Sequence, residues 1–461
     1  MNLQFKSYLF VTVCTIFIFV TEVNAQFEMG LYGLREIPQS NLINPAFIPE
    51  GELIIGIPFL SSISHSTYSS SFSFNDIFIK KAGSDSLYLN LSSIASKNYT
   101  KNFITGYVEN DIIYFGLKIK KNGYLSSGIR NRVYSRVMYS TDMIKLLWNG
   151  NGNYIGEKLD LTNTFINHDH FLSYYVGYSL VINKNVSLGL RANLNQGLSS
   201  IQTVKNELTM RTSAHSDYIY NIDANTGFLV NTSGIVGDSV DGNQSISEYV
   251  FNFNNIGFSI DFGGDFKVSE RIKLNVSVVD LGFISWKSNL RSYENTNDSV
   301  QFSGIYNDIN INEDVFQAFA DSLNELFEIK EFDQKFKTIL PTRIYFGIEY
   351  YSLNKKNRYS FLFSGIFLKE SFSSAFSLGY DRTISERFTF KVNYTYLKYA
   401  PLNIGAGLVL NLKPIQIYLI TDNILSGFYW SGQKYFNFRF GINLVFAHKR
   451  DMKKVEADVI D

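Results

Sequence analysis

The short cluster His168-Asp169-His170 holds the residue types that bind metals or act as general bases. If the segment is extended, its two histidines share one face, because alternate side chains of a strand point to the same side. Two ligands on an exposed loop are fewer than the three or four protein ligands of zinc sites, so we expect a solvated loop. The segment Asp238–Asn243 lacks the spacing and the downstream Glu of a calcium loop. Neither segment therefore predicts a metal centre.

Motifs of the common hydrolases and nucleotide-binding enzymes do not occur. The sequence contains no GxSxG, HExxH, GxxxxGK or CxxC, and its single cysteine, Cys14, lies in an apolar run near the N-terminus. A thiol nucleophile and a disulfide framework are therefore not expected. We predict a non-enzymatic protein with no catalytic residues, no metal and no cofactor.

Basic residues recur at positions that alternate with apolar ones. Five of them would line the polar side of a sheet, namely Arg191, Lys273, Arg343, Lys391 and Arg439. Such a row of cations could bind the anionic head group of an amphipathic ligand. Polar linings also occur without a ligand, so both interpretations stay open at this point.

Four of these cations, all except Arg343, lie in segments with the sequence pattern of β-strands. Apolar and polar residues alternate along Val186–Asn195, Ile272–Val278, Phe388–Tyr396 and Phe436–Phe446. A period of two with one apolar face is typical of a half-buried strand. Strands of about ten residues, with Lys, Arg and Asn opposite aromatics, fit a membrane barrel with a polar lumen better than a soluble sandwich. We expect the aromatic faces to form the lipid-facing band.

Composition supports this class and excludes others. The 461 residues include 42 Lys plus Arg and 42 Asp plus Glu, so no basic excess indicates a nucleic-acid partner. Aromatic residues make up 16% of the chain, which argues against a disordered protein. No run of 18 apolar residues follows the N-terminal region, so helical membrane spans are not predicted.

Turn lengths set the topology. Short polar turns are expected at 120–123, 183–185, 269–270, 353–357, 385–386 and 412–414, and very long connections at about 201–255 and 287–340. Short turns that alternate with long loops are typical of the periplasmic and extracellular ends of an outer-membrane barrel. With a first strand near Glu52–His65, the pattern predicts an all-β transmembrane barrel of about 14 antiparallel strands. Short helices are expected at Thr141–Trp148 and from Asn312 to Phe327 in the long loops.

The N-terminus resembles a secretory signal peptide. Lys6 precedes the apolar stretch Tyr8–Val20, and Val23-Asn24-Ala25 offers the small residues of a cleavage site between Ala25 and Gln26. As a membrane anchor the stretch would reach only about 20 Å, short of the ~30 Å hydrocarbon core. We predict a signal peptide at 1–25, a hatch-like segment at 26–51, the barrel at 52–447 and a periplasmic tail at 448–461. Both termini of the mature chain would be periplasmic, and outer-membrane lipid and the barrel-assembly machinery would be partners.

Several motifs resemble those of a known family. The segment Leu34–Asn41 followed by Asn44–Phe47, together with Trp148–Asn151, Tyr175–Thr203 and Val278–Trp286, is similar to an uncharacterised family of Bacteroidota outer-membrane proteins. More distantly, Asn44-Pro45-Ala46 is similar to FadL-like long-chain fatty-acid transporters and to PorV-like proteins of type IX secretion. In those families fourteen strands surround an N-terminal hatch that includes this tripeptide.

The resemblance implies two functions. A FadL-like barrel would pass or bind a hydrophobic or amphipathic solute, with Asn44, Pro45 and Ala46 in the hatch. A PorV-like protein would instead bind secreted proteins or other envelope components with its long loops. Because Pro45 fixes its own φ and restricts Asn44, a rigid turn before the first strand is the alternative role for this tripeptide.

Overall fold

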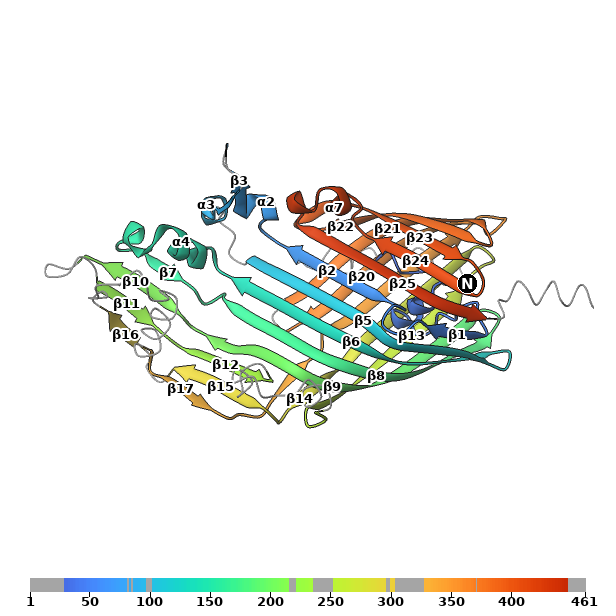
Figure 1. The fold of residues 1–461 in the computed structure, drawn as a ribbon, viewed down its shortest axis with the longest axis horizontal. Coiled ribbons are helices and arrows are strands. Elements are labelled where there is room, and N and C mark those ends of the chain that lie inside the picture. Colours follow the sequence, from blue (N-terminus) through green and yellow to red (C-terminus); the bar gives the residue numbers. More distant parts are fainter. Residues whose placement is uncertain are drawn as a thin grey trace, which may run out of the picture.

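The chain folds as an all-β barrel. The computed structural model describes residues 29–80, 83, 86–96, 102–214, 221–234, 252–295, 299–302, 327–369 and 371–446. Its wall is a closed antiparallel β-barrel of 14 strands, as the sequence predicted. Figure 1 shows the strands running obliquely between an end with short turns, at the right, and an end with long loops, at the left.

The strands follow one another around the ring in chain order. The first position is shared by β1 (Leu53–Gly56) and β2 (Ile63–Ser69), and the next are β5 (Asn102–Ile119), β6 (Gly123–Tyr139), β8 (Phe165–Asn183), β9 (Val186–Asn206), β13 (Ile256–Lys267), β14 (Ile272–Trp286), β19 (Thr342–Tyr351), β20 (Asn357–Leu368), β21 (Ser371–Ser385), β22 (Phe388–Leu397), β23 (Ala400–Asn411), β24 (Ile415–Thr421) and β25 (Tyr435–Phe446). A short strand, β18 (Phe336–Ile339), continues the position of β19 and also pairs with β14.

The first position closes the ring. Strands β1 and β2 pair with β25 on one side and with β5 on the other. The predicted single strand Glu52–His65 is wrong in one respect, because the wall is interrupted between Gly56 and Ile63. Pro58 in this gap has no N–H for a ladder, and Phe59 has a φ of 62°.

The six predicted short turns all join neighbouring strands at one end of the barrel. The helix predicted at Thr141–Trp148 is also confirmed, as α4 (Thr141–Asn149). Its N-cap is Ser140, whose Oγ accepts a hydrogen bond of 3.1 Å from the backbone N–H of Met143. The predicted signal peptide, the C-terminal tail, segment 238–243 and almost all of the second helix lie outside the described residues.

The long connections contain strands that the sequence did not predict. β7 (Lys158–Asp160), β10 (Thr209–Ser213), β11 (Asn221–Asn225) and β16 (Ser299–Phe302) form a four-stranded sheet beyond the barrel. β12 (Phe228–Ser233) extends the wall from β9 to β15 (Leu290–Asn295), which pairs with β17 (Ile329–Phe332). Smaller elements near the same end are α2 (Phe74–Ile77), β3 (Phe78–Lys80), β4 (Leu87–Leu89), α3 (Ser92–Ala95), η2 (Asn151–Tyr154), α7 (Leu425–Phe428) and η4 (Trp430–Gly432). Among the described residues, no helix has the length and apolar character needed to cross a membrane.

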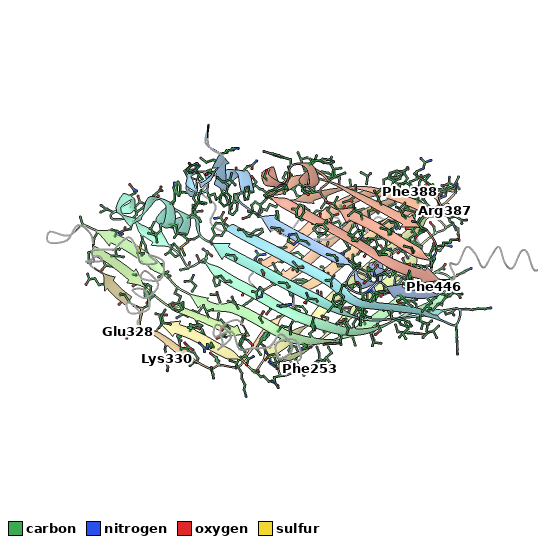
Figure 2. The ribbon with its side chains drawn as sticks, viewed as in Figure 1. Phe253, Glu328, Lys330, Arg387, Phe388 and Phe446 are labelled. Carbon is green, nitrogen blue, oxygen red and sulfur yellow. The ribbon has the colours of Figure 1, made fainter. Side chains whose placement is uncertain are left out.

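Side chains alternate between the two faces of the wall. Along β25, Asn437, Arg439 and Asn443 are buried inside, whereas Phe438 and Phe440 on the other face are partly exposed. This is the pattern of an apolar exterior in lipid around an interior that excludes solvent. In Figure 2, Arg387, Phe388 and Phe446 mark the short-turn end, and Glu328 and Lys330 lie on the loop side.

The outward face yields a stability prediction. Leu378 lies midway along β21 with 58% of its surface exposed, so Leu378→Arg should place a charge near mid-bilayer and cost about 2–4 kcal/mol. Leu353→Arg is the control, because Leu353 is 80% exposed in the short turn before β20 and should cost about 1 kcal/mol or less. Reversible unfolding in phospholipid vesicles measures both. Equal losses would contradict the assignment of the lipid face.

Candidate functional site

The N-terminal segment lies inside the barrel. We call Met29–Gly51 the hatch; it contains one short 3-10 helix, η1 (Pro38–Leu42), and no strand of the wall. Met29, Ile37 and Phe47 are at most 1% exposed. Figure 1 shows this segment in dark blue within the ring of strands, near the short-turn end. The hatch therefore fills the lumen at that end.

The tripeptide Asn44-Pro45-Ala46 forms a rigid turn within the hatch. The Asn44 side-chain oxygen accepts a hydrogen bond of 2.9 Å from the Ala46 N–H. The Pro45 carbonyl accepts one of 2.6 Å from Ser179 Oγ on β8 and one of 3.1 Å from Asn41 Nδ2. The two interpretations of this tripeptide are thus compatible, since the turn lies inside the lumen and contacts the wall.

Two of the five predicted lumen cations bind hatch carbonyls. Arg191, only 1% exposed, donates to the Asn41 carbonyl at 2.9 Å and to the Leu42 carbonyl at 2.7 Å. Lys391 Nζ donates to the Tyr32 carbonyl at 2.7 Å. A segment without ladder partners leaves backbone oxygens unsatisfied, and these cations satisfy three of them. Their role as ligand-binding residues stays a prediction.

A third predicted cation, Lys273, lies beside a hatch ion pair. Arg35 of the hatch donates to both carboxylate oxygens of Asp265 at 2.6 and 2.9 Å, and to Glu349 at 3.2 Å. Lys273 Nζ is 3.5 Å from the same Asp265 carboxylate. The Arg35 guanidinium also lies 4.3 Å from the ring centre of Phe47. Electrostatic contacts with β13 and β19 thus hold the hatch in place.

The remaining two, Arg343 and Arg439, belong to a buried charged network on the loop side of the hatch. Its centre is Glu109 on β5, which accepts hydrogen bonds from Arg130 at 2.7 Å, Arg132 at 3.1 Å and Arg439 at 3.3 Å. Arg343 lies 3.6 Å from the same carboxylate. Burial without such partners would be costly for every one of these charges.

This network crosses the lumen. Arg132 on β6 makes a bidentate pair with Asp280 on β14, at 2.6 and 2.7 Å, although these two strands do not pair with each other. Asp280 also accepts from Arg343 at 2.5 Å. We call Glu109, Arg130, Arg132, Asp280, Arg343 and Arg439 the cross-lumen cluster. It forms a second obstruction between the hatch and the loop end.

An apolar column runs beside the charged network. Tyr68, Phe103 and Tyr435 line the lumen toward the loop end, with ring centres 5.4 Å apart for Tyr68–Phe103 and 6.0 Å for Tyr68–Tyr435. These rings belong to one buried cluster that reaches hatch residues including Leu34 and Phe47. The expectation of a polar lumen is therefore wrong for this part. At the start of β25, Tyr435 faces the lumen and the next residue, Phe436, faces outward. Because both residues are aromatic, the alternation in the sequence did not show that the Tyr435 ring lies in the lumen.

The two histidines lie within β8 and not on a loop, which corrects the prediction for this segment. His168 Nδ1 is 2.7 Å from Ser135 Oγ, and His170 Nε2 is 2.8 Å from Asn131 Oδ1. Hydroxyl and amide neighbours satisfy these rings. No group of three His, Cys, Asp or Glu residues suited to a metal occurs in the described part of the chain.

Close packing at Gly189 provides a test of the hatch. A Cβ at Gly189 would lie 2.1 Å from the Pro45 carbonyl carbon, so Gly189→Val should displace the hatch without breaking the ladder. We expect trypsin then to cut at Arg35, which is partly buried in the native protein, while the barrel keeps its heat-modifiable mobility. In Gly106→Val the new Cβ meets nothing within 4 Å, so Arg35 should stay protected. Protection of Arg35 in both variants would contradict this seating of the hatch.

Comparisons with known proteins give one family and several structures. The model of a family of unknown function (DUF5723) matches residues 45–422. No curated protein sequence matches the chain. The toluene transporter TbuX of Ralstonia pickettii is similar in structure, with 9% identity, a TM-score of 0.42, and coverage of 89% of this chain and 95% of TbuX. A Pseudomonas aeruginosa FadL homologue has 10% identity and a TM-score of 0.42, and the match covers 93% of this chain and 98% of the homologue. The Pseudomonas putida toluene transporter TodX has 10% identity and a TM-score of 0.39, and the match covers 92% of this chain and 98% of TodX.

Proposed function

Because this chain belongs to a family of unknown function (DUF5723), its activity has to be inferred from its geometry, and we propose that it passes apolar or amphipathic solutes through a lumen closed by its own hatch. The proposal places the barrel in an outer membrane, with the long loops outside and the short turns in the periplasm. A solute would enter among the loops and leave past the hatch.

The apolar column carries this proposal. A barrel for water-soluble solutes has a polar, water-filled interior. Here buried side chains including Tyr68, Phe103, Met138 and Ile366 form one cluster with the hatch. An apolar molecule can exchange its contacts with lipid or water for contacts with this column, whereas a sugar would lose hydrogen bonds there.

The hatch is suited to displacement. It forms no ladder with the wall, and side chains such as Arg191, Ser277 and Lys391 hold it by hydrogen bonds. These bonds can be replaced by bonds to water when the segment moves, and no backbone ladder of the wall has to break. The ring of strands can therefore stay intact while the hatch moves and opens the lumen.

The cross-lumen cluster suits the polar end of an amphipathic solute. Its four guanidinium groups, on Arg130, Arg132, Arg343 and Arg439, contact the carboxylates of Glu109 and Asp280, and Arg130 Nε also lies 3.4 Å from Asp111. Four positive charges thus face three negative ones. We propose that an anionic head group competes with these carboxylates for Arg343 and Arg439, while the apolar tail lies in the column.

Extraction from the native membrane in mild detergent, followed by mass spectrometry, tests this function. We expect an apolar or amphipathic molecule bound in near-stoichiometric amount. Binding of envelope or secreted proteins by the loops was the other prediction from the sequence. A reproducible protein partner in samples without any bound small molecule would contradict transport and favour that function.

A further inference from the structure

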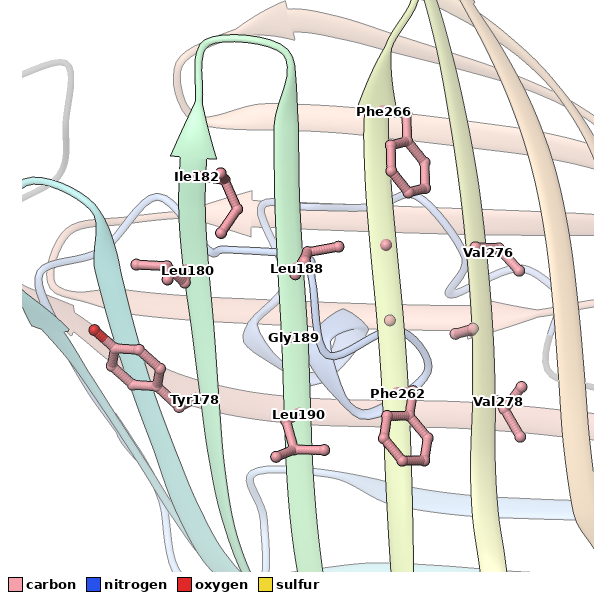
Figure 3. A pocket seen from close by; sticks show the side chains of 13 residues that line it. Tyr178, Leu180, Ile182, Leu188, Gly189, Leu190, Phe262, Phe266, Val276 and Val278 are labelled. Carbon is pink, nitrogen blue, oxygen red and sulfur yellow. The ribbon is translucent and has the colours of Figure 1, made fainter.

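The outer surface of the barrel has an apolar hollow of about 530 Å³ near the short-turn end. Figure 3 shows it across β8, β9, β13 and β14, with Phe262 and Phe266 on β13 and Leu188 and Leu190 on β9. The same side chains alternate with lumen residues such as Arg191, so they face away from the lumen. The hollow therefore opens toward the membrane and not toward the lumen.

Glycines form the floor of the hollow. Gly189, Gly263 and Gly264 lie on adjacent strands between the larger apolar side chains. A Cβ at Gly264 would meet the Phe266 ring at 2.7 Å, which places this position on the outer face. Only at Gly264 does the missing side chain open space on the outer face, between Phe262 and Phe266.

At Gly189 and Gly263, no side chain separates the strand backbone from the hatch on the inner side of the wall. On the inner side, a Cβ at Gly263 would lie 2.1 Å from Asn44 Oδ1, and one at Gly189 would lie 2.1 Å from the Pro45 carbonyl. Figure 3 shows the hatch behind β9 and β13. The rigid turn of the hatch thus packs against the inner face of β9 and β13, and the hollow lies on the outer face of the same strands.

We propose that this hollow is a binding site for one acyl chain of a membrane phospholipid. The residues around it are almost all aliphatic or aromatic, and they face the region of the membrane whose solvent is hydrocarbon. Ile182 borders the hollow two residues before the exposed Lys184 in the short β8–β9 turn. A phospholipid with its chain in the hollow has its phosphate at the level of this turn, where a lysine is favourable.

The bound chain fills the space left open at Gly264, on the face of the wall opposite the hatch turn. This site is separate from the proposed passage of solutes, because it lies outside the wall. A failure of transport would not affect it, and a failure of lipid binding would not affect transport.

Native mass spectrometry with palmitoyl-oleoyl-phosphatidylethanolamine tests the site. Val276 on β14 borders the hollow and is 44% exposed, so Val276→Trp should fill it and reduce retention of the lipid at least fivefold. Val392→Trp is the matched control, because Val392 on β22 is 43% exposed, lies four residues from its strand start like Val276, and is remote from the hollow. We expect it to retain one lipid, as the wild type does.

Leu190→Phe provides a second variant that narrows the hollow from β9, and it should also lower retention. Heat-modifiable mobility in gels confirms that each variant is folded. Equal retention by Val276→Trp and the wild type would overturn the proposal. Equal loss in Val276→Trp and Val392→Trp would overturn it as well, because the lipid would then bind the surface without a defined site.

Discussion

Cross-linking the hatch to the barrel wall is expected to reduce the flux of an apolar solute at least tenfold, a change of about 1.4 kcal/mol or more in the barrier. Gln39 of the hatch and Asn443 of β25 exchange two side-chain hydrogen bonds of 3.0 Å. Cysteines are shorter than these side chains, so a bifunctional thiol reagent such as dibromobimane is preferable to a disulfide. The described part of the chain has no cysteine of its own, so the reagent should join only the introduced pair. Flux of a fluorescent apolar probe into proteoliposomes measures the effect.

A cross-link within the wall is the control for the hatch cross-link. Ser377 on β21 and Thr395 on β22 are direct partners in the ladder, and their hydroxyls lie 3.1 Å apart inside the barrel. Joining cysteines at these positions leaves the hatch unattached, and flux should stay near that of the wild type. Unchanged flux in the cross-linked hatch variant would mean that solutes do not pass through this end of the lumen.

Neutralising Glu109 should cost the barrel about 3–5 kcal/mol of unfolding free energy, because buried arginines then lose their counter-charge. Glu109 is 4% exposed and contacts Arg130, Arg132 and Arg439. Glu109→Gln keeps the shape of the side chain and removes only its charge. Urea unfolding in phospholipid vesicles, followed by tryptophan emission, measures the difference.

The matched control lies in a short turn. Glu270→Gln removes an acid that pairs with Lys267 at 2.6 Å, and this acid is 79% exposed. Solvent and salt screen such a pair, so we expect no measurable change. If Glu109→Gln were as harmless as Glu270→Gln, the cross-lumen cluster would not be a desolvated network.

Most of the barrel wall could be predicted because its signal is local. Alternation along Phe436–Phe446 and the six short turns each depend on neighbouring residues in the chain. These features were sufficient for the faces of β25 from Phe436 onward and, together with the first strand near Glu52–His65, for the strand count. The break between β1 and β2 was not predicted, although Pro58 in the sequence argues against a continuous strand because proline has no N–H for the ladder.

The interior could be predicted only in part. Arg191, Lys273, Arg343, Lys391 and Arg439 were assigned to the inner face, and all five have polar or charged partners there. Apart from Asp265, which lies eight residues before Lys273 on the neighbouring strand, the partners come from strands or hatch residues far away in sequence. Single-strand patterns hold no information about such partners. The loop-end sheet of β7, β10, β11 and β16 was missed because its strands are only three to five residues long.

The hatch was predicted from the resemblance of the chain to known families more than from its own pattern of apolar and polar residues. Asn44-Pro45-Ala46 marked its position, but nothing in its spacing indicates that Gly189 and Gly263 lie against this turn. Likewise, Tyr68 and Phe103 were not predicted in the lumen, because an aromatic at an inward position looks the same in sequence as one facing lipid. Closure of the ring decides which face each residue takes.

The most direct test of the account compares two probes of similar size in proteoliposomes that contain the full barrel. One probe is an apolar fluorescent hydrocarbon that is trapped inside by a binding protein, and the other is a labelled sugar. A lumen with an apolar column and a closed hatch should pass the hydrocarbon faster than protein-free vesicles do and should retain the sugar. Passage of the sugar at the same rate, or no gain for the hydrocarbon over protein-free vesicles, would contradict the account.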